Sequence, residues 1–308
     1  MSSGHVTYAS ESDRHSHQPC ESDDDSFHET WYLAWYDRRS DAVGFHHVGQ
    51  YRKTGVADVW SWLALRGRTV AHYENLELPL AAGDISDFEL GGVVVKAADD
   101  MVQRVNVSHG DVSSSVEYRA FSQPFYFSMD TGGVGYGAGH MESLGRVSGN
   151  VCLPDEIVEV DGWGYHDHSW GSRDYGAVVS QRWVYGVFGA DLFFSVMSFV
   201  LPSGVTMHRG FVFEQGEFHG VEELTYGLQV ATDGYSPESC RLTIWTAGGR
   251  GYEASAQVRL SETSRHHGGY FQTDGFGPFK LGGRLGTGQV HIRERAVPPP
   301  FVDPRSRL

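Results

Sequence analysis

The sequence predicts an all-β protein built from two consecutive antiparallel, barrel-like halves. Aromatic residues make up 13% of the 308 residues, and there are 39 glycines but only 24 lysines and arginines together. Aromatic residues favour strands, and glycine favours the tight turns between them. The apolar runs are short and are separated by turn residues, and no long amphipathic helix is evident. Many short strands with short connections are typical of closed or nearly closed barrels.

The first half follows a polar segment. Residues 1–26 are rich in Ser, His and Asp and hold almost nothing apolar, so we expect a disordered leader. His15 and His17 of this segment could also contact a metal. From Phe27 onward, alternating residues are apolar or aromatic on both faces, which predicts a strand covered on both sides. The further strand-like runs are 43–51, 56–65, 69–73, 91–96, 101–107 and 114–120. Among them, 56–65 also fits one face of a helix.

The second half repeats this style. We expect one barrel over residues 27–148, a second over 149–297, and a C-terminal tail at 298–308. The strand-like runs of the second half are 157–160, 162–169, 177–186, 191–200, 205–214, 224–232, 241–246, 252–260 and 288–295. The glycine-rich stretch 131–139 lacks the strand–loop–helix context of a phosphate-binding loop, so a bend is the better interpretation.

Charge and cysteine content exclude several classes of function. The formal net charge of −15 argues against binding to nucleic acid or to an anionic membrane. No stretch approaches 18 apolar residues and no secretory signal is evident, so we expect no stable membrane insertion and a cytoplasmic protein. Cys20, Cys152 and Cys240 are far apart, which fits a reduced compartment. A neutral, hydrophobic small molecule is the partner that suits this composition, and the oligomeric state stays open.

Residues 162–174 carry the densest cluster of chemically active side chains. They read Gly-Trp-Gly-Tyr-His-Asp-His-Ser-Trp-Gly-Ser-Arg-Asp. Strand alternation places His166, His168 and Trp170 on one face, and Tyr165, Asp167 and Ser169 on the other.

The segment Asp167-His168-Ser169-Trp170-Gly171 resembles the Asp-His-x-Trp-Gly motif of the carotenoid 1,2-hydratase (hydroxyneurosporene synthase) and AttH-like superfamily. His140-Met141-Glu142, followed by residues 145–149, resembles the segment that precedes this motif in related proteins. The resemblance implies two tandem lipocalin-like barrels with a ligand pocket in or between them. It also implies water addition to isoprenoid double bonds or, as in fungal relatives, pericyclic ring closure. The Tyr-x-Asp of carotenoid hydratases is Tyr185-Gly186-Val187 here.

This chemistry needs an acid that is neutral at the working pH, and a carboxyl group buried among aromatic rings meets that need. Asp167 is the first candidate and Asp174 the second. His168 would orient the acid or activate water, and aromatic faces would stabilise the resulting cation. We therefore expect a cofactor-independent acid/base enzyme that protonates an isoprenoid or polyene, followed by hydration, dehydration, isomerisation or cyclisation. The other expected site residues are Tyr185 as a catalytic group, and Trp163, Tyr165, His166, Trp170, Arg173, Trp183, His140 and Glu142 as substrate-binding groups.

Three alternatives stay open at this point. Asp167 or Asp174 could pair with Arg173 and be catalytically silent. His166 and His168 could bind a metal together with Glu214 or His208, but an arginine nearby disfavours a cation, so we expect no metal. A non-catalytic carrier for a lipid or terpenoid, or a pericyclase of the same fold, would suit tandem barrels equally well.

Overall fold

The computed structural model describes residues 7–21, 25–80, 83–130, 135–266 and 270–295. Almost every element in these ranges is a β strand, and the described helices are two single turns, η1 (Ser12–Arg14) and η2 (Tyr175–Ala177). The all-β prediction is therefore confirmed. Nowhere in the described ranges is there a helix with the length and apolar character that crossing a membrane requires. The chain divides into two compact units, with the border between Asp174 and Tyr175.

The N-terminal unit is one curled antiparallel sheet. Its strand order is β5-β4-β3-β2-β12-β11-β9-β8-β7-β6, with β10 also paired to β11 and β1 paired to β10. The strands are β1 (Thr7–Tyr8), β2 (Phe27–Asp37), β3 (Ala42–Tyr51), β4 (Val56–Leu65), β5 (Arg68–Pro79), β6 (Asp87–Leu90), β7 (Val93–Asp99), β8 (Val102–His109), β9 (Val112–Ala120), β10 (Phe125–Asp130), β11 (Gly135–Leu153) and β12 (Glu156–Ser172).

This sheet is a half-barrel, because among the described residues its end strands β5 and β6 are not paired with each other. β6 has only four residues and cannot match the twelve of β5. The expected first barrel is thus an open, curled sheet. Residues 56–65, for which a helix was also considered, form strand β4 between β3 and β5.

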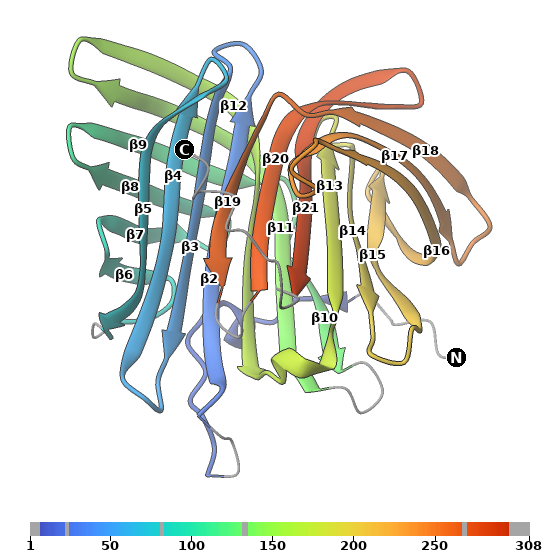
Figure 1. Cartoon of the computed structure of the whole chain (residues 1–308), viewed down its shortest axis with the longest axis horizontal. Coiled ribbons are helices and arrows are strands. Elements are labelled where there is room, and N and C mark those ends of the chain that lie inside the picture. Colours follow the sequence, from blue (N-terminus) through green and yellow to red (C-terminus); the bar gives the residue numbers. More distant parts are fainter. Residues whose placement is uncertain (1–6, 22–24, 81–82, 131–134, 267–269, 296–308) are drawn as a thin grey trace. The chain divides into compact units, whose positions relative to one another are not determined.

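The C-terminal unit is a closed barrel of eight antiparallel strands, which Figure 1 colours from yellow to red. Pairing between β18 and β20 closes it, and β19 pairs with the first part of β20. The eight strands of the barrel are β13 (Ser180–Val187), β14 (Leu192–Val200), β15 (Thr206–Glu214), β16 (Glu217–Val230), β17 (Pro237–Thr246), β18 (Gly251–Gln257), β20 (Tyr270–Leu281) and β21 (Arg284–Arg295). β19 (Leu260–His266) is a further strand of the same sheet, outside the closed ring.

The border between the units differs from the expected one at 148/149. β12 pairs along one edge with β2 and along the other with β11, so the whole of the conspicuous motif belongs to the first sheet. The reason is long-range pairing: β2 precedes β12 by about 130 residues, and no local pattern reveals which distant strand completes a sheet.

Each unit has its own apolar core. Inward side chains alternate with outward ones, as in β9, where Val112, Ser114, Val116, Tyr118 and Ala120 are buried and the residues between them are more exposed. By contrast, all eleven residues of β2 are buried, as the sequence predicts for a strand covered on both faces.

The polar N-terminal segment differs from the expected disordered leader over residues 7–21. The Arg14 guanidinium lies 2.8 Å from the carboxylate of Asp100, and the Ser16 amide donates to Asp84 Oδ2 at 2.9 Å. These polar contacts hold the segment together with the pairing of β1 to β10 and the burial of Ala9 beside Met141 and Trp170. Residues 1–6 and 22–24 of the expected leader, 131–134 of the glycine-rich stretch and the expected tail 298–308 lie outside the described residues.

Candidate active site

The candidate site is built on the long hairpin of β11 and β12. A two-residue turn, Pro154-Asp155, joins the strands and fixes their register, since Leu153 lies opposite Glu156. Further along, Glu142 lies directly opposite Asp167, and Met141 opposite His168. Because successive side chains alternate, the hairpin presents two different chemical faces.

Two glycines, one on each strand, shape the end of the hairpin where Trp170 lies. Gly171 has φ +118°, and a Cβ there would lie 2.3 Å from the Ala138 amide nitrogen. Only glycine adopts this bend without strain. Gly139 lies opposite Trp170, and a Cβ there would lie 2.3 Å from the indole. The absence of a side chain at Gly139 is what lets the Trp170 ring lie across the neighbouring strand.

The first face, which we call the acid face, consists of His140, Glu142, Tyr165 and Asp167. Glu142 is fully buried and Asp167 is 4% exposed. His140 Nε2 lies 3.0 Å from Glu142 Oε1 and 3.5 Å from the Tyr165 hydroxyl. Two carboxyl groups, an imidazole and a phenol therefore meet in a buried patch on adjacent strands.

Burial raises the pKa of Asp167 to about 7. Charge on His140 opposes this rise in pKa, the Glu142 carboxylate adds to it, and Arg173 opposes it in turn. Burial, reinforced by Glu142, also raises the pKa of Tyr165 well above its usual value, so its hydroxyl keeps its proton. The acid face can therefore hold and release a proton near neutral pH.

Arg173 and Asp174 follow the motif. The Arg173 guanidinium donates to Ser169 Oγ, and Ser169 Oγ lies 2.6 Å from Thr30 Oγ1. Arg173 thus lies on the side of β12 that carries Asp167, as an orienting charge should. Asp174 is exposed, so it does not meet the requirement for a carboxyl group kept away from water.

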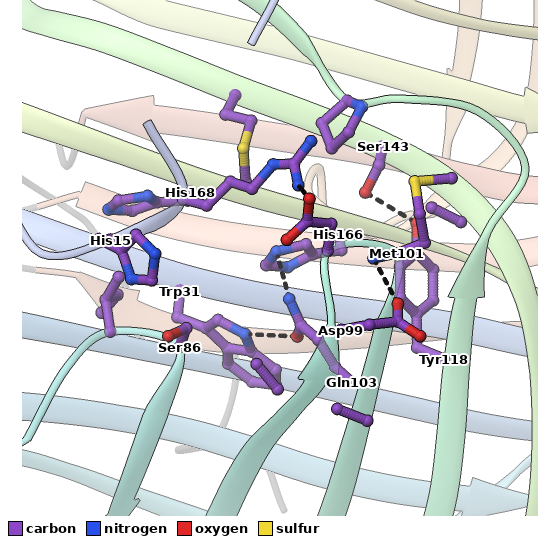
Figure 2. A pocket seen from close by; sticks show the side chains of 18 residues that line it. His15, Trp31, Ser86, Asp99, Met101, Gln103, Tyr118, Ser143, His166 and His168 are labelled. Carbon is purple, nitrogen blue, oxygen red and sulfur yellow. Dashed lines mark hydrogen bonds and ion pairs between the residues drawn. The ribbon is translucent and has the colours of Figure 1, made fainter. Parts of the chain in front are cut away.

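The opposite face of the hairpin lines a cavity of about 190 Å³ (Figure 2). His166 lies in a hydrogen-bonded chain there. Its Nδ1 donates to the Tyr32 carbonyl at 2.8 Å, and its Nε2 accepts from Gln103 at 2.9 Å, while Trp31 Nε1 donates to Gln103 at 3.0 Å. Burial lowers the pKa of His166 to about 4, which agrees with this neutral tautomer. The shared face predicted for His166 and His168 is confirmed, since both line the cavity.

His168 does not orient Asp167, because consecutive strand residues point to opposite faces. His168 Nδ1 lies 2.8 Å from the carbonyl of Asp13, and its Nε2 lies 3.4 Å from Glu29 Oε1. The expected Asp167–His168 pair is thus replaced by Asp167 with His140, which the sequence analysis placed only among the substrate-binding groups.

The expected aromatic wall is also divided. Trp170 lies on the cavity side of β12, where its ring stacks on His17 at 3.9 Å. Trp163 is half-buried and lies on the acid-face side of β12. Trp183 and Tyr185 lie on β13, in the other unit, where Trp183 Nε1 donates to Ser195 Oγ at 3.0 Å. The metal ligands considered for His166 and His168, namely His208 and Glu214, belong to that other unit as well.

Sequence reasoning missed Glu29 and Gln103, and it considered His17 only as a histidine of the leader that could contact a metal. Glu29 had a detectable signal, because it is in phase with Trp31, Leu33 and Trp35 and so points to their buried side of β2. A carboxylate in an otherwise apolar row is unusual and marks a functional or paired group. Gln103 had no such signal, and the neighbours of both His17 and Gln103 follow from tertiary packing alone.

The family model for a domain of unknown function, DUF7064, matches residues 10–296. The chain belongs to the DUF7064 family. No curated protein sequence is significantly similar to it.

Solved structures share the fold of this DUF7064 protein. A proposed AttH from Nitrosomonas europaea is 13% identical, with a TM-score of 0.68 over 87% of this chain and 92% of that one. CghA with Sch210972 is 12% identical, with a TM-score of 0.60 over 94% of this chain and 98% of that one. Kievitone hydratase from Nectria haematococca is 12% identical, with a TM-score of 0.61 over 94% of this chain and 96% of that one. At this level of identity the likeness establishes the all-β lipocalin-like fold and no more.

Proposed function

We propose that this protein is a cofactor-independent acid/base enzyme that protonates a double bond in a hydrophobic isoprenoid or polyene. The observation that carries the proposal is the direct opposition of Asp167 and Glu142 on paired strands, with both side chains buried. Burial disfavours the ionised form of Asp167, and the charge of Glu142 on the paired strand raises its pKa further. This supports Asp167 as the carboxyl group that retains a proton.

The proposed reaction begins with proton transfer from Asp167 to the double bond. The π electrons of the alkene form the new C–H bond as the O–H bond of Asp167 breaks, and a carbocation is left on the other alkene carbon. Water then adds its oxygen to that carbon, and the proton it loses returns to the Asp167 carboxylate or to His140. Loss of a different proton would give an isomer or a diene, and attack by a second double bond would give a ring.

Two relatives in fold support this reaction class. Kievitone hydratase is named for a hydration, and CghA was solved with Sch210972. The resemblance of residues 167–171 to the motif of carotenoid hydratases points to the same class. We extend these activities to the present chain as part of the proposal, with a hydrophobic small molecule as its partner.

The test is turnover of a panel of isoprenoid alkenes and polyenes in D₂O, followed by mass spectrometry. We expect the product to carry solvent deuterium on carbon. We expect Asp167→Asn to lower the rate by at least about 100-fold, as loss of a general acid does. The matched control is Asp174→Asn, which changes an exposed carboxyl near the end of the same strand and should retain activity. Deuterium-free product, or full activity in Asp167→Asn, would overturn the proposal.

A carrier is the second candidate, and one observation favours it. The cavity of about 190 Å³ lies on the face of the hairpin opposite Asp167, so a ligand there would not touch the proposed acid. Tight binding of a terpenoid, measured by quenching of tryptophan fluorescence, without conversion by the wild type would support the carrier. An isomerised product that lacks deuterium would instead support a pericyclase.

A further inference from the structure

A cluster of His17, Glu29 and His168 lies on the cavity side of the N-terminal sheet, away from the acid face. His17 comes from the polar N-terminal segment, Glu29 from β2 and His168 from β12. One ligand atom from each lies within 4.8 Å of the other two. Glu29 is fully buried and His168 is 1% exposed. Three metal-binding side chains from distant parts of the sequence thus converge below the surface.

We propose that His17, Glu29 and His168 bind a divalent transition-metal ion, preferentially zinc, and that this ion fastens the N-terminal segment 7–21 to the sheet. Two imidazoles and one carboxylate, with a fourth position left to water, form a ligand set that zinc uses in proteins. The proposal concerns a site that the acid/base reaction does not use, because the acid face is on the other side of β12.

The tautomer of His168 is the first argument. Its Nδ1 lies 2.8 Å from the Asp13 carbonyl, which can only accept, so Nδ1 carries the hydrogen. A second-shell carbonyl of this kind is what holds a metal-bound histidine in position. Nε2 has no hydrogen-bond partner and faces Glu29 Oε1 at 3.4 Å, which is longer than an ordinary N–H···O bond. Nε2 is thus the His168 nitrogen that faces the carboxylate, and a cation between Nε2 and Glu29 Oε1 would bond to both atoms.

The distances are the second argument. With metal–ligand bonds of 2.0–2.1 Å, neighbouring ligand atoms in a tetrahedral zinc site lie about 3.3 Å apart. Here Glu29 Oε1 lies 3.1 Å from His17 Nδ1 and 3.4 Å from His168 Nε2. These two separations lie within a few tenths of an ångström of the tetrahedral spacing, and the His17 and His168 ligand atoms lie within 4.8 Å of each other.

Neighbouring groups set the strength and consequence of binding. Arg52 Nε lies 2.8 Å from Glu29 Oε2, so it orients the carboxylate through the oxygen that the metal does not use. Its positive charge also opposes a cation, so we expect an affinity in the micromolar range. His17 stacks on Trp170 at 3.9 Å, and Arg14 and His15 line the cavity that Figure 2 shows. An ion on His17 would therefore hold the segment that covers part of the cavity.

The experiment uses the full chain after treatment with EDTA. Zn²⁺ is titrated by calorimetry, and Co²⁺ is added separately to obtain the visible absorption bands of the ligand field. We expect one ion per chain, and an affinity at least about 100-fold lower in His17→Ala, since loss of a ligand costs at least as much as loss of a second-shell partner. His17 is partly exposed, so this variant should fold, which circular dichroism checks.

His15→Ala is the matched control, because His15 belongs to the same segment and pairs with Asp84 but lies outside the cluster. It should bind both ions as the wild type does. Hydrogen exchange of residues 10–17 should slow with Zn²⁺ in the wild type and not in His17→Ala. The absence of stoichiometric binding, wild-type affinity in His17→Ala, or an equal loss in His15→Ala would each overturn the proposal.

Discussion

Replacement of Asp167 by Asn should change how the stability of the protein depends on pH. The pKa of Asp167 is about 7 in the folded protein, against about 3.9 for an aspartate in an unfolded chain. Between these values the folded state binds more protons than the unfolded state, so the free energy of unfolding falls as the pH rises. The asparagine side chain is neutral throughout and contributes no such dependence.

The magnitude follows from the two pKa values. From pH 5 to pH 8, the wild type should lose about 2.5 kcal/mol of unfolding free energy relative to Asp167→Asn. Urea unfolding of both proteins at the two pH values, followed by tryptophan fluorescence, measures this difference. Titration of groups that do not interact with Asp167 cancels between the two proteins. Asp174→Asn is the control, since a surface substitution should stay within about 0.5 kcal/mol of the wild type at both pH values.

If the free energy of unfolding differs between wild type and Asp167→Asn by the same amount at pH 5 and at pH 8, the pKa of Asp167 is not raised. Asp167 is then ionised in the folded protein across this range, and a carboxylate that is already ionised cannot protonate an alkene.

Three further predictions concern the fold. Gly171→Ala should lower the free energy of unfolding, measured with urea, by about 1–3 kcal/mol, because a residue with a Cβ is strained at φ +118° and the Cβ meets Ala138. Gly248→Ala is the control and should be nearly neutral, because a Cβ there meets nothing within 4 Å. Leu33→Ala removes a side chain of zero exposure and should cost about 2–5 kcal/mol, while Leu285→Ala, 51% exposed, should cost less than about 0.5 kcal/mol; equal costs would contradict the assigned core. His46, whose pKa burial lowers to about 3, should remain neutral at pH 5 in an NMR titration, and a midpoint near 6.5 would show that it is solvated.

The sequence allowed the strand content to be predicted, because alternation and turn residues act locally. The strand that carries Asp167 and the shared face of His166 and His168 followed from the period of two. The partner strands did not follow, since β12 pairs with β2 across about 130 residues and this pairing sets the border at Asp174. The order of the N-terminal segment was not predictable either, because its polar contacts exist only once the sheet has formed.

The candidate site also combines local features, which the sequence predicts, with long-range ones, which it does not. Strand alternation places His168 and Trp170 on the face opposite Asp167, but their closeness in sequence led us to expect all three in one site. The groups that do meet Asp167, namely Glu142 and His140, come from the neighbouring strand. The resemblance of residues 140–142 had put both among the expected substrate-binding groups, and the register Glu142–Asp167 shows that they lie beside the proposed acid.

The proposed reaction requires that Asp167 holds a proton near neutral pH, and a direct titration of its carboxyl group measures this. The carboxyl carbons of ¹³C-labelled aspartate can be followed by NMR from pH 3 to pH 9, with the Asp167 signal identified by its absence in Asp167→Asn. We expect a midpoint near the value of about 7 that burial gives this group. A midpoint below about 5, within the ordinary range for aspartate, would contradict it.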